Sequence, residues 1–337
     1  MHSFAYERAG SAADAARAGK QTGQGEPAAP AQFLAGGTTL VDLMKLNVLQ
    51  PARVIDVNAL RAQHSTISFD DKGLTLGAFA SMAEAAAHPA VLAHYPVIVD
   101  TLKLAASTQI RNMATLGGNL LQRTRCTYFR DVTWSACNKR TPGSGCAALE
   151  GFNRNHAVLG VDSSCIAQYP GDFAIALIAL DAVLTLQGAS SSRKLPFATL
   201  HRPAEGKPHL EHTLKPGELI TAISVPAGPW TRRSLYIKVR DRESYEFAIS
   251  SAAVALDLEG GAVRAARIGL GGMAYRPWRA TEAEAALTGK PLNEDTASAA
   301  AGMALKGAIT HGQNAYKPDL AQRTLVRALL AARDMRT

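Results

Sequence analysis

Four cysteines are the side chains in this sequence most able to bind a metal centre. They are Cys126, Cys137, Cys146 and Cys165, separated by ten, eight and eighteen residues. All lie in or beside residues 123–157, where Gly, Pro, Asn, Arg and Lys are dense between short apolar pieces. Thiolates grouped in a segment with little regular structure can replace a hydrophobic core by ligating a metal or an iron–sulfur cluster.

The cysteine spacing by itself leaves four interpretations open: a 4Fe–4S cluster, unligated thiols, two disulfides or a zinc site. Zinc sites usually contain pairs of cysteines only a few residues apart, which this chain lacks. Two disulfides require an oxidising compartment. A cluster with four thiolates is anionic, and nearby basic residues would offset its charge. These are Arg123, Arg125, Arg130, Lys139, Arg140 and Arg154. The spacing favours a cluster and leaves the other three open.

Two glycine-rich turns could bind an anion. The first, Ala35-Gly36-Gly37-Thr38, follows a predicted strand at 32–35 and precedes a predicted helix that starts at Leu40. Glycines let the backbone approach a ligand closely, and the free amides at the start of a helix attract phosphate. The hydroxyls of Thr38 and Thr39 can add hydrogen bonds. A single turn of this kind is weak evidence for a site.

The second turn lies within residues 110–119, which read Ile-Arg-Asn-Met-Ala-Thr-Leu-Gly-Gly-Asn. Two such turns in adjacent units suggest a pyrophosphate held from both sides. Neither matches the dinucleotide fingerprint of a doubly wound fold, and no P-loop lysine is present. The pattern therefore argues against an ordinary nicotinamide or ATP site.

The overall composition is that of a folded, multi-domain protein. The 337 residues are 47% hydrophobic and 19% charged, which suits two or three packed domains. The longest apolar runs, such as 173–180, are too short to cross a bilayer, and residues 1–8 contain no signal peptide or twin-arginine pattern. The net charge of +8 comes without a run of five basic residues. We therefore expect no membrane insertion, no nucleic-acid partner and no export signal on this chain.

The elements that position these residues suggest an α+β protein of three units. The expected boundaries are 1–62, 63–228 with a four-cysteine insertion at about 123–165, and 229–337. The predicted strands are 3–8, 32–35, 53–57, 74–78, 182–187, 235–240, 252–258 and 262–269. Helices are predicted after Ser11 and at 172–180, and from 282, 296 and 320, whereas 188–217 reads as turns.

Several segments, in order, resemble one known family. They are 35–38, 110–119, Tyr236-Ile237-Lys238-Val239-Arg240, 269–274 and 277–280. Together they are similar to the FAD-binding medium subunits of the xanthine dehydrogenase and carbon monoxide dehydrogenase family, over nearly the whole chain. Residues 119–126, 137–140, 143–151 and 165–167 look in addition like the flavoprotein subunits of periplasmic aldehyde oxidoreductases.

This resemblance implies a two-lobed PCMH/VAO-type FAD-binding domain followed by a small α+β C-terminal domain. It also implies a 4Fe–4S cluster on Cys126, Cys137, Cys146 and Cys165. Asp172 matches an acidic residue that contacts FAD, Ile220 an aliphatic neighbour of the cofactor, and Lys238 a lysine that faces the flavin ring. The pyrophosphate would be held by Phe33, Leu34, Ala35, Gly36, Gly37, Thr38, Thr39, Leu40 and Val41, with Thr115, Gly118 and Asn119.

The resemblance further implies electron transfer within a complex. A molybdopterin-binding large subunit would oxidise an aldehyde, and a small subunit would pass electrons through 2Fe–2S clusters to this chain, which reduces an external acceptor. Residues 241–247, which include Tyr245, depart from the NAD-using relatives, so we expect an acceptor other than NAD. Export to the periplasm would depend on a partner's twin-arginine signal, with a cytoplasmic complex as the alternative. The rival functions are a stand-alone flavin oxidoreductase and a disulfide-bonded binding protein.

Overall fold

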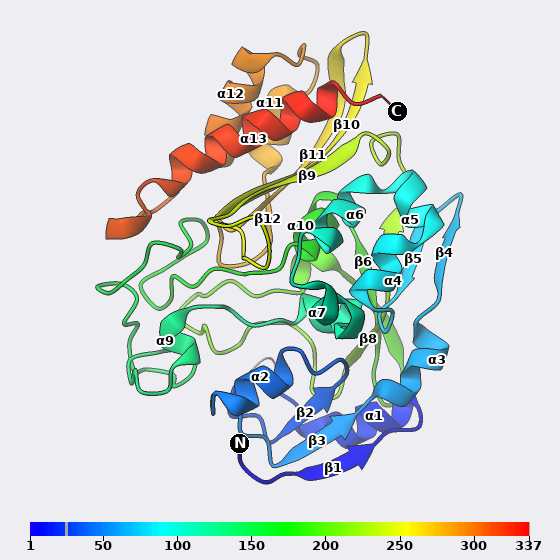
Figure 1. Cartoon of the computed structure of the whole chain (residues 1–337), viewed down its shortest axis with the longest axis vertical. Coiled ribbons are helices and arrows are strands. Elements are labelled where there is room, and N and C mark those ends of the chain that lie inside the picture. Colours follow the sequence, from blue (N-terminus) through cyan, green and yellow to red (C-terminus); the bar gives the residue numbers. More distant parts are fainter. Residues whose placement is uncertain (24–25, 337) are drawn as a thin grey trace.

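The computed structural model describes residues 1–23 and 26–336, which form three lobes stacked along the long axis (Figure 1). The N-terminus lies at one end of the molecule and the C-terminus near the other. The α+β architecture expected from the sequence is confirmed. Across the described residues, no helix is both long and apolar enough to pass through a lipid bilayer.

The first lobe is a small parallel sheet of order β1-β3-β2. Its strands are β1 (Ala5–Arg8), β2 (Ala31–Leu34) and β3 (Arg53–Asp56), and its helices are α1 (Ala12–Ala18) and α2 (Leu40–Lys45). Ser11 caps α1 as predicted, because its hydroxyl accepts from the Asp14 amide at 3.1 Å. Between β2 and α2 the chain passes through the first glycine turn, which follows directly on the carboxyl end of β2.

The second lobe is an antiparallel sheet of order β4-β5-β8-β6-β7. Its strands are β4 (Ile67–Asp70), β5 (Gly73–Gly77), β6 (Val183–Gln187), β7 (Ser192–Pro196) and β8 (Leu219–Pro226). Its helices are α3 (Arg61–His64), α4 (Met82–Ala87), α5 (Pro89–His94), α6 (Pro96–Lys103), α7 (Thr108–Met113), α8 (Leu116–Leu120) and α10 (Phe173–Ala179). All seven residues of α10 are buried, which explains its uninterrupted apolar sequence.

Within residues 188–217, which were predicted to be rich in turns, the structure also contains the strand β7. This strand is at the sheet edge and only Leu195 is buried along it. An edge strand with one buried side chain lacks the apolar alternation by which strands are recognised in a sequence. The irregular character predicted for 123–157 is confirmed, since the only helix or strand there is the four-residue α9 (Thr127–Arg130).

The third lobe packs helices on one face of an antiparallel sheet of order β12-β11-β10-β9. The strands are β9 (Ser234–Val239), β10 (Ser250–Glu259), β11 (Ala262–Gly271) and β12 (Trp278–Arg279). The helices are α11 (Thr281–Leu287), α12 (Glu294–Ala304) and α13 (Lys317–Arg333). Val254 and Ile268 of the sheet form one core with Leu325 and Leu329 of α13.

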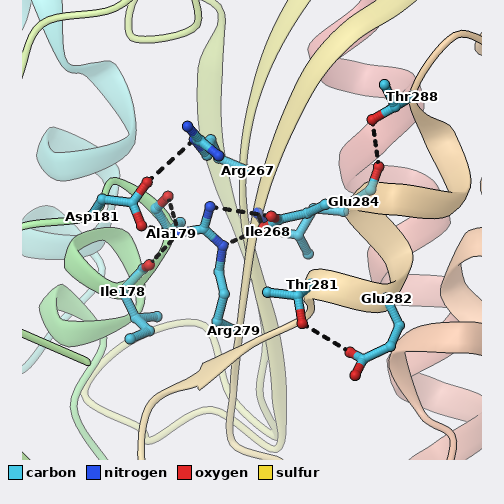
Figure 2. Close-up of polar contacts among 10 residues, drawn as sticks. All are labelled: Ile178, Ala179, Asp181, Arg267, Ile268, Arg279, Thr281, Glu282, Glu284 and Thr288. Carbon is cyan, nitrogen blue, oxygen red and sulfur yellow. Dashed lines mark hydrogen bonds and ion pairs between the residues drawn. The ribbon is translucent and has the colours of Figure 1, made fainter. Parts of the chain in front are cut away.

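Arg279 joins the third lobe to the second (Figure 2). Its guanidinium donates to the carbonyls of Ile178 and Ala179, both at 2.6 Å, where α10 ends. It also pairs with Asp181 at 3.0 Å and with the buried carboxyl of Glu284. A cation at a helix C-terminus satisfies carbonyls that have no partner within the helix. This contact therefore ties the C-terminal end of α10 in the second lobe to β12 and α11 in the third.

Candidate cofactor sites

The first glycine turn connects β2 to α2 and packs directly on the second turn. Gly37 has a φ of +73°, in the left-handed region that glycine adopts without strain. A Cβ on Gly36 would lie only 1.9 Å from the carbonyl oxygen of Met113. Only glycine permits this approach of the two backbones, so the structure brings the two sequence-distant turns together.

The second glycine turn is held by the end of β5 and by its own cap. The Thr115 hydroxyl accepts from the Gly118 amide at 3.1 Å, which starts α8. The Gly117 amide donates to the carbonyl of Ala78 at 2.8 Å. The second turn is therefore fixed by hydrogen bonds within the protein.

A first cavity lies between the two turns and is closed by β8. It measures about 1220 Å³, including space open to solvent. Most of the predicted pyrophosphate residues line it, and so does Ile220. Those lining it are Phe33, Ala35, Gly36, Gly37, Thr38, Thr39, Leu40, Thr115, Gly118 and Ile220.

A second cavity of about 1270 Å³, again including open solvent, continues from the first. Thr38 and Thr39 line both cavities, so a ligand held at these threonines can extend into each. Asn119 and Asp172, both predicted from the sequence, line the second cavity. The two cavities together suit a long ligand with a central anionic group and two bulky ends.

Asn119, at the wall of the second cavity, has a side-chain acceptor that the described residues leave unsatisfied. Its amide nitrogen lies 3.4 Å from the Met82 sulfur, and its buried side-chain oxygen has no hydrogen-bond partner among the described residues. A buried acceptor without a partner is costly, so it is satisfied by a ligand or by water. The site therefore fits a cofactor with hydrogen-bond donors, as FAD has.

Asp172 is presented to the second cavity by two partners from β9. The Tyr236 hydroxyl donates to one carboxyl oxygen at 2.6 Å, and the Lys238 ammonium lies 2.7 Å from the other. Burial raises the pKa of Asp172, and Lys238 and Tyr236 oppose that rise. These contacts hold the carboxyl in a single orientation at the cavity wall.

Three of the predicted residues lie outside the walls of both cavities. Leu34 packs into the core beneath α2, and Val41 is partly exposed. Lys238 directs its ammonium to Asp172 and to the Leu104 carbonyl, at 3.0 Å, behind the cavity wall. A direct contact between Lys238 and a flavin ring stays a prediction.

The loop between β9 and β10 also lines the second cavity. Arg242, Tyr245 and Phe247 line it, and Tyr245 has a φ of +53°, which is strained for a tyrosine. The departure of 241–247 from NAD-using relatives pointed to Tyr245. No local pattern pointed to Arg242 or Phe247, because only the tertiary fold brings this loop across the cavity.

The four cysteines are free and converge in the irregular segment. Cys137 and Cys146 are opposite each other in a short antiparallel bridge. The Cys165 thiol donates to Cys146, which lowers the pKa of Cys146 to about 6 and raises that of Cys165. Cys126 is packed into the same apolar surroundings as each of the other three. Four thiols thus meet in one enclosed place.

The arrangement of the cysteines differs from that of a single-ion site. Among residues 1–23 and 26–336, no three Cys, His, Asp or Glu side chains converge as closely as one metal ion requires. A 4Fe–4S cluster takes one thiolate on each iron, so its four sulfurs surround a larger body. Free thiols gathered within apolar walls are chemically suited to such a cluster.

Most of the basic residues near the cysteines are already paired. Lys139, which is fully buried, lies 2.7 Å from Glu211 and faces Cys165, and Arg123 also pairs with Glu211. Asp42 pairs with Arg125 at 3.4 Å and with Arg130 at 2.9 Å. Arg154 pairs with Asp241, and Arg140 donates to backbone carbonyls. The charge left to offset a cluster is thus smaller than the sequence suggested.

Comparison with known proteins identifies the family. Residues 2–228 match the FAD binding domain in molybdopterin dehydrogenase, and residues 235–332 match the CO dehydrogenase flavoprotein C-terminal domain. The chain belongs to this family of FAD-binding subunits. It is therefore an oxidoreductase subunit that binds FAD and acts within a complex.

Two relatives show how far the likeness extends. The aldehyde oxidoreductase FAD-binding subunit PaoB of Escherichia coli strain K12 is 43% identical over 335 residues, covering 99% of both chains. The carbon monoxide dehydrogenase medium chain of Afipia carboxidovorans is 29% identical over 339 residues, covering 98% of this chain and 97% of its own length. The family resemblance read from the sequence is confirmed.

A solved structure supports the same assignment. The crystal structure of the Cu,Mo-CO dehydrogenase contains a chain that superposes with a TM-score of 0.74 at 26% identity, covering 98% of each chain. The two-lobed FAD-binding domain followed by the C-terminal flavoprotein domain is thus the architecture of this family. The first cavity lies within the part matched by the FAD-binding domain, and the second is completed by residues 242–247 of the part matched by the C-terminal domain.

Proposed function

We propose that this chain is the FAD- and 4Fe–4S-containing electron-transfer subunit of a molybdenum-dependent aldehyde oxidoreductase. The observation that carries the proposal is the pair of joined cavities between the glycine turns, beside four converging cysteines. Electrons would arrive from the 2Fe–2S clusters of a small partner subunit. A large molybdopterin-binding partner would oxidise the aldehyde.

FAD, when bound, supplies the exchange between two-electron and one-electron chemistry. The chain's own residues position it. The amides and hydroxyls of the glycine turns hold the pyrophosphate, and Thr38 and Thr39 stand where the two cavities meet. Asn119 and Asp172 offer acceptors to the end of the cofactor in the second cavity. The loop with Tyr245 and Phe247 limits access of solvent to that end.

Aldehydes as substrates are supported by the relatives. The 43% identical protein is an aldehyde oxidoreductase subunit, and the glyceraldehyde dehydrogenase medium chain of Sulfolobus acidocaldarius is 27% identical over 262 residues. The cluster is supported by the free, converging cysteines. A stand-alone flavin oxidoreductase is the less favoured alternative, because the relatives are medium chains and subunits of larger enzymes.

The decisive experiment measures cofactors in the purified full-length chain and in its native assembly. The proposal expects flavin absorption over a broad brown band, one FAD per chain and about four irons. A Cys126→Ala, Cys137→Ala double variant should lose the iron and keep the FAD. Ser163→Ala, at an exposed position between the cysteines, is the matched control. Flavin without iron in the wild type would refute the cluster, and a colourless chain would refute the whole proposal.

The proposal also covers the external electron acceptor and the cellular compartment of the complex. We place the complex in the periplasm, carried by a partner's twin-arginine signal. We give it an acceptor other than NAD, because Tyr245 lines the second cavity, where we propose that the flavin ring binds. Stopped-flow reoxidation by NAD should be negligible beside reoxidation by an artificial quinone. Rapid reoxidation by NAD would contradict this. Fractionation of cells, with and without the twin-arginine pathway, tests the compartment.

A further inference from the structure

The imidazole ring of His156 contacts one of the four cysteines. Its Nε2 lies 3.2 Å from the Sγ of Cys126. The side chain of His156 is buried, with 8% exposure, and its ring lies 6.3 Å from that of Tyr128. A nitrogen at this distance from a thiol sulfur is within hydrogen-bonding range.

The proton on this ring can be assigned from its surroundings. A thiolate has no hydrogen to donate, so a bond between Cys126 and His156 requires the hydrogen on Nε2. The other ring nitrogen, Nδ1, is buried and has no hydrogen-bond partner among the described residues. Nothing described therefore stabilises a hydrogen on Nδ1, and the Nε2–H tautomer fits the site.

The third lobe fixes the backbone of His156 from behind. The carbonyl of His156 accepts from the Lys317 ammonium at 3.0 Å and from the Asn314 amide at 3.4 Å. Its own amide donates to Asn153 at 2.9 Å. Asn153 in turn exchanges two hydrogen bonds with Gln313, at 3.2 and 3.0 Å. The segment that carries His156 is thus attached to the start of α13.

Lys317 makes this attachment through hydrogen bonds to carbonyl and amide oxygens. It is fully buried, and its ammonium also donates to Gly272 at 2.5 Å and to Gln168 at 2.9 Å. Burying a lysine is unfavourable unless its hydrogen bonds are satisfied. Several acceptors around one ammonium hold this junction together, and the backbone of His156 is one of the groups that it fixes.

We infer that His156 is a positioning residue that donates its Nε2–H to the Cys126 thiolate and thereby raises the reduction potential of the iron–sulfur cluster. The inference rests on the cluster assigned under the proposed function. A hydrogen bond to a ligand sulfur withdraws electron density, and the reduced cluster, which carries the extra negative charge, gains more from it. The backbone amides of Tyr128 and Phe129, which also face this sulfur, remain in any variant of His156.

The test is a redox titration of the cluster, followed by electron paramagnetic resonance in the full-length chain as isolated. His156→Phe removes the donor and keeps an aromatic ring, so its cluster potential should shift to more negative values. His156→Gln retains an N–H donor and should restore most of the shift. His94→Phe, where the histidine stacks on Phe69 in the second lobe, is the matched control and should not shift. The flavin potential should stay unchanged in all variants.

Each remaining outcome counts against the inference. An iron-loaded His156→Phe chain with an unchanged cluster potential overturns it and leaves the proposed function intact. Loss of iron from both the Phe and the Gln variant also overturns it, because His156 would then be needed for assembly rather than for the potential. A wild-type chain without iron refutes the cluster itself, and the inference with it.

Discussion

The ammonium of Lys238 lies 2.7 Å from the carboxyl of Asp172, and the two side chains are only 1% and 4% exposed. They come from positions sixty-six residues apart, on β9 and immediately before α10. Each would be costly to bury alone. Their pairing places one carboxyl at the wall of the second cavity, where the flavin end of FAD is expected.

Breaking this pair should destabilise the chain more than removing it entirely. Asp172→Asn leaves the buried Lys238 ammonium without its counter-charge and should lower the free energy of unfolding by about 3 kcal/mol. The double variant Asp172→Asn, Lys238→Met should recover a large part of that loss. Denaturant titration measures both. Asp319→Asn, which removes the exposed Asp319–Arg323 pair, should have no measurable effect. Equal losses in the single and double variants would contradict the pairing argument.

Gly36→Ala should abolish FAD binding. The new Cβ would collide with the Met113 carbonyl at 1.9 Å, and backbone on both sides leaves no flexible side chain to move away. The two turns must then separate, and we expect FAD content to fall at least tenfold. Gly302→Ala is the control, because nothing lies within 4 Å of its added Cβ and it is inside α12. That control should keep its FAD and gain about 0.5 to 1 kcal/mol of stability.

Stability should rise with pH because of Lys317. Burial, assisted by the charge of Arg154, lowers the pKa of Lys317 from 10.5 to about 7. Between these values the unfolded chain binds a proton that the folded chain releases, so the folded state gains stability as pH increases. Relative to Lys317→Met, the wild type should gain about 2 kcal/mol of unfolding free energy from pH 7 to pH 9. Parallel curves for the two proteins would show that Lys317 stays charged when folded.

Arg279→Met should loosen the junction between the second and third lobes. It removes the donors to the Ile178 and Ala179 carbonyls and leaves Glu284, whose pKa is raised by burial, without its cation. We expect a loss of about 3 kcal/mol, measured by denaturant titration. Adding Glu284→Gln should recover part of it. Arg264→Met, whose side chain is 61% exposed, should change little, and a similar loss there would contradict the argument.

The glycine turns and the cysteines were recognisable from the sequence because their chemistry is local. Gly36 and Gly37 precede a helix within a few residues, and Thr115 caps α8 from the position immediately before it. Burial of α10 was readable for the same reason, since every residue of the helix is apolar. The edge strand β7 was not recognised from the sequence, because only one of its side chains is apolar and buried.

The contacts that shape the site could not be predicted in the same way. Nothing near Gly36 in sequence specifies Met113, and nothing near Lys238 specifies Asp172. Tyr245 was singled out by comparison with a family, whereas its strained φ of +53° is a property of the folded loop. No pattern in the sequence indicated a role for His156, because Cys126, which its side chain contacts, is thirty residues away in the chain.

The sequence by itself determined which side chains are available: two glycine turns, four thiols and the helices and strands that carry them. Tertiary structure alone decided which of these meet. The physical reason is that backbone conformation, helix capping and apolar periodicity act over a few residues, whereas buried charges and orphaned polar atoms find partners only when distant segments pack. Asp172 with Lys238, Gly36 with Met113 and His156 with Cys126 are all of the second kind.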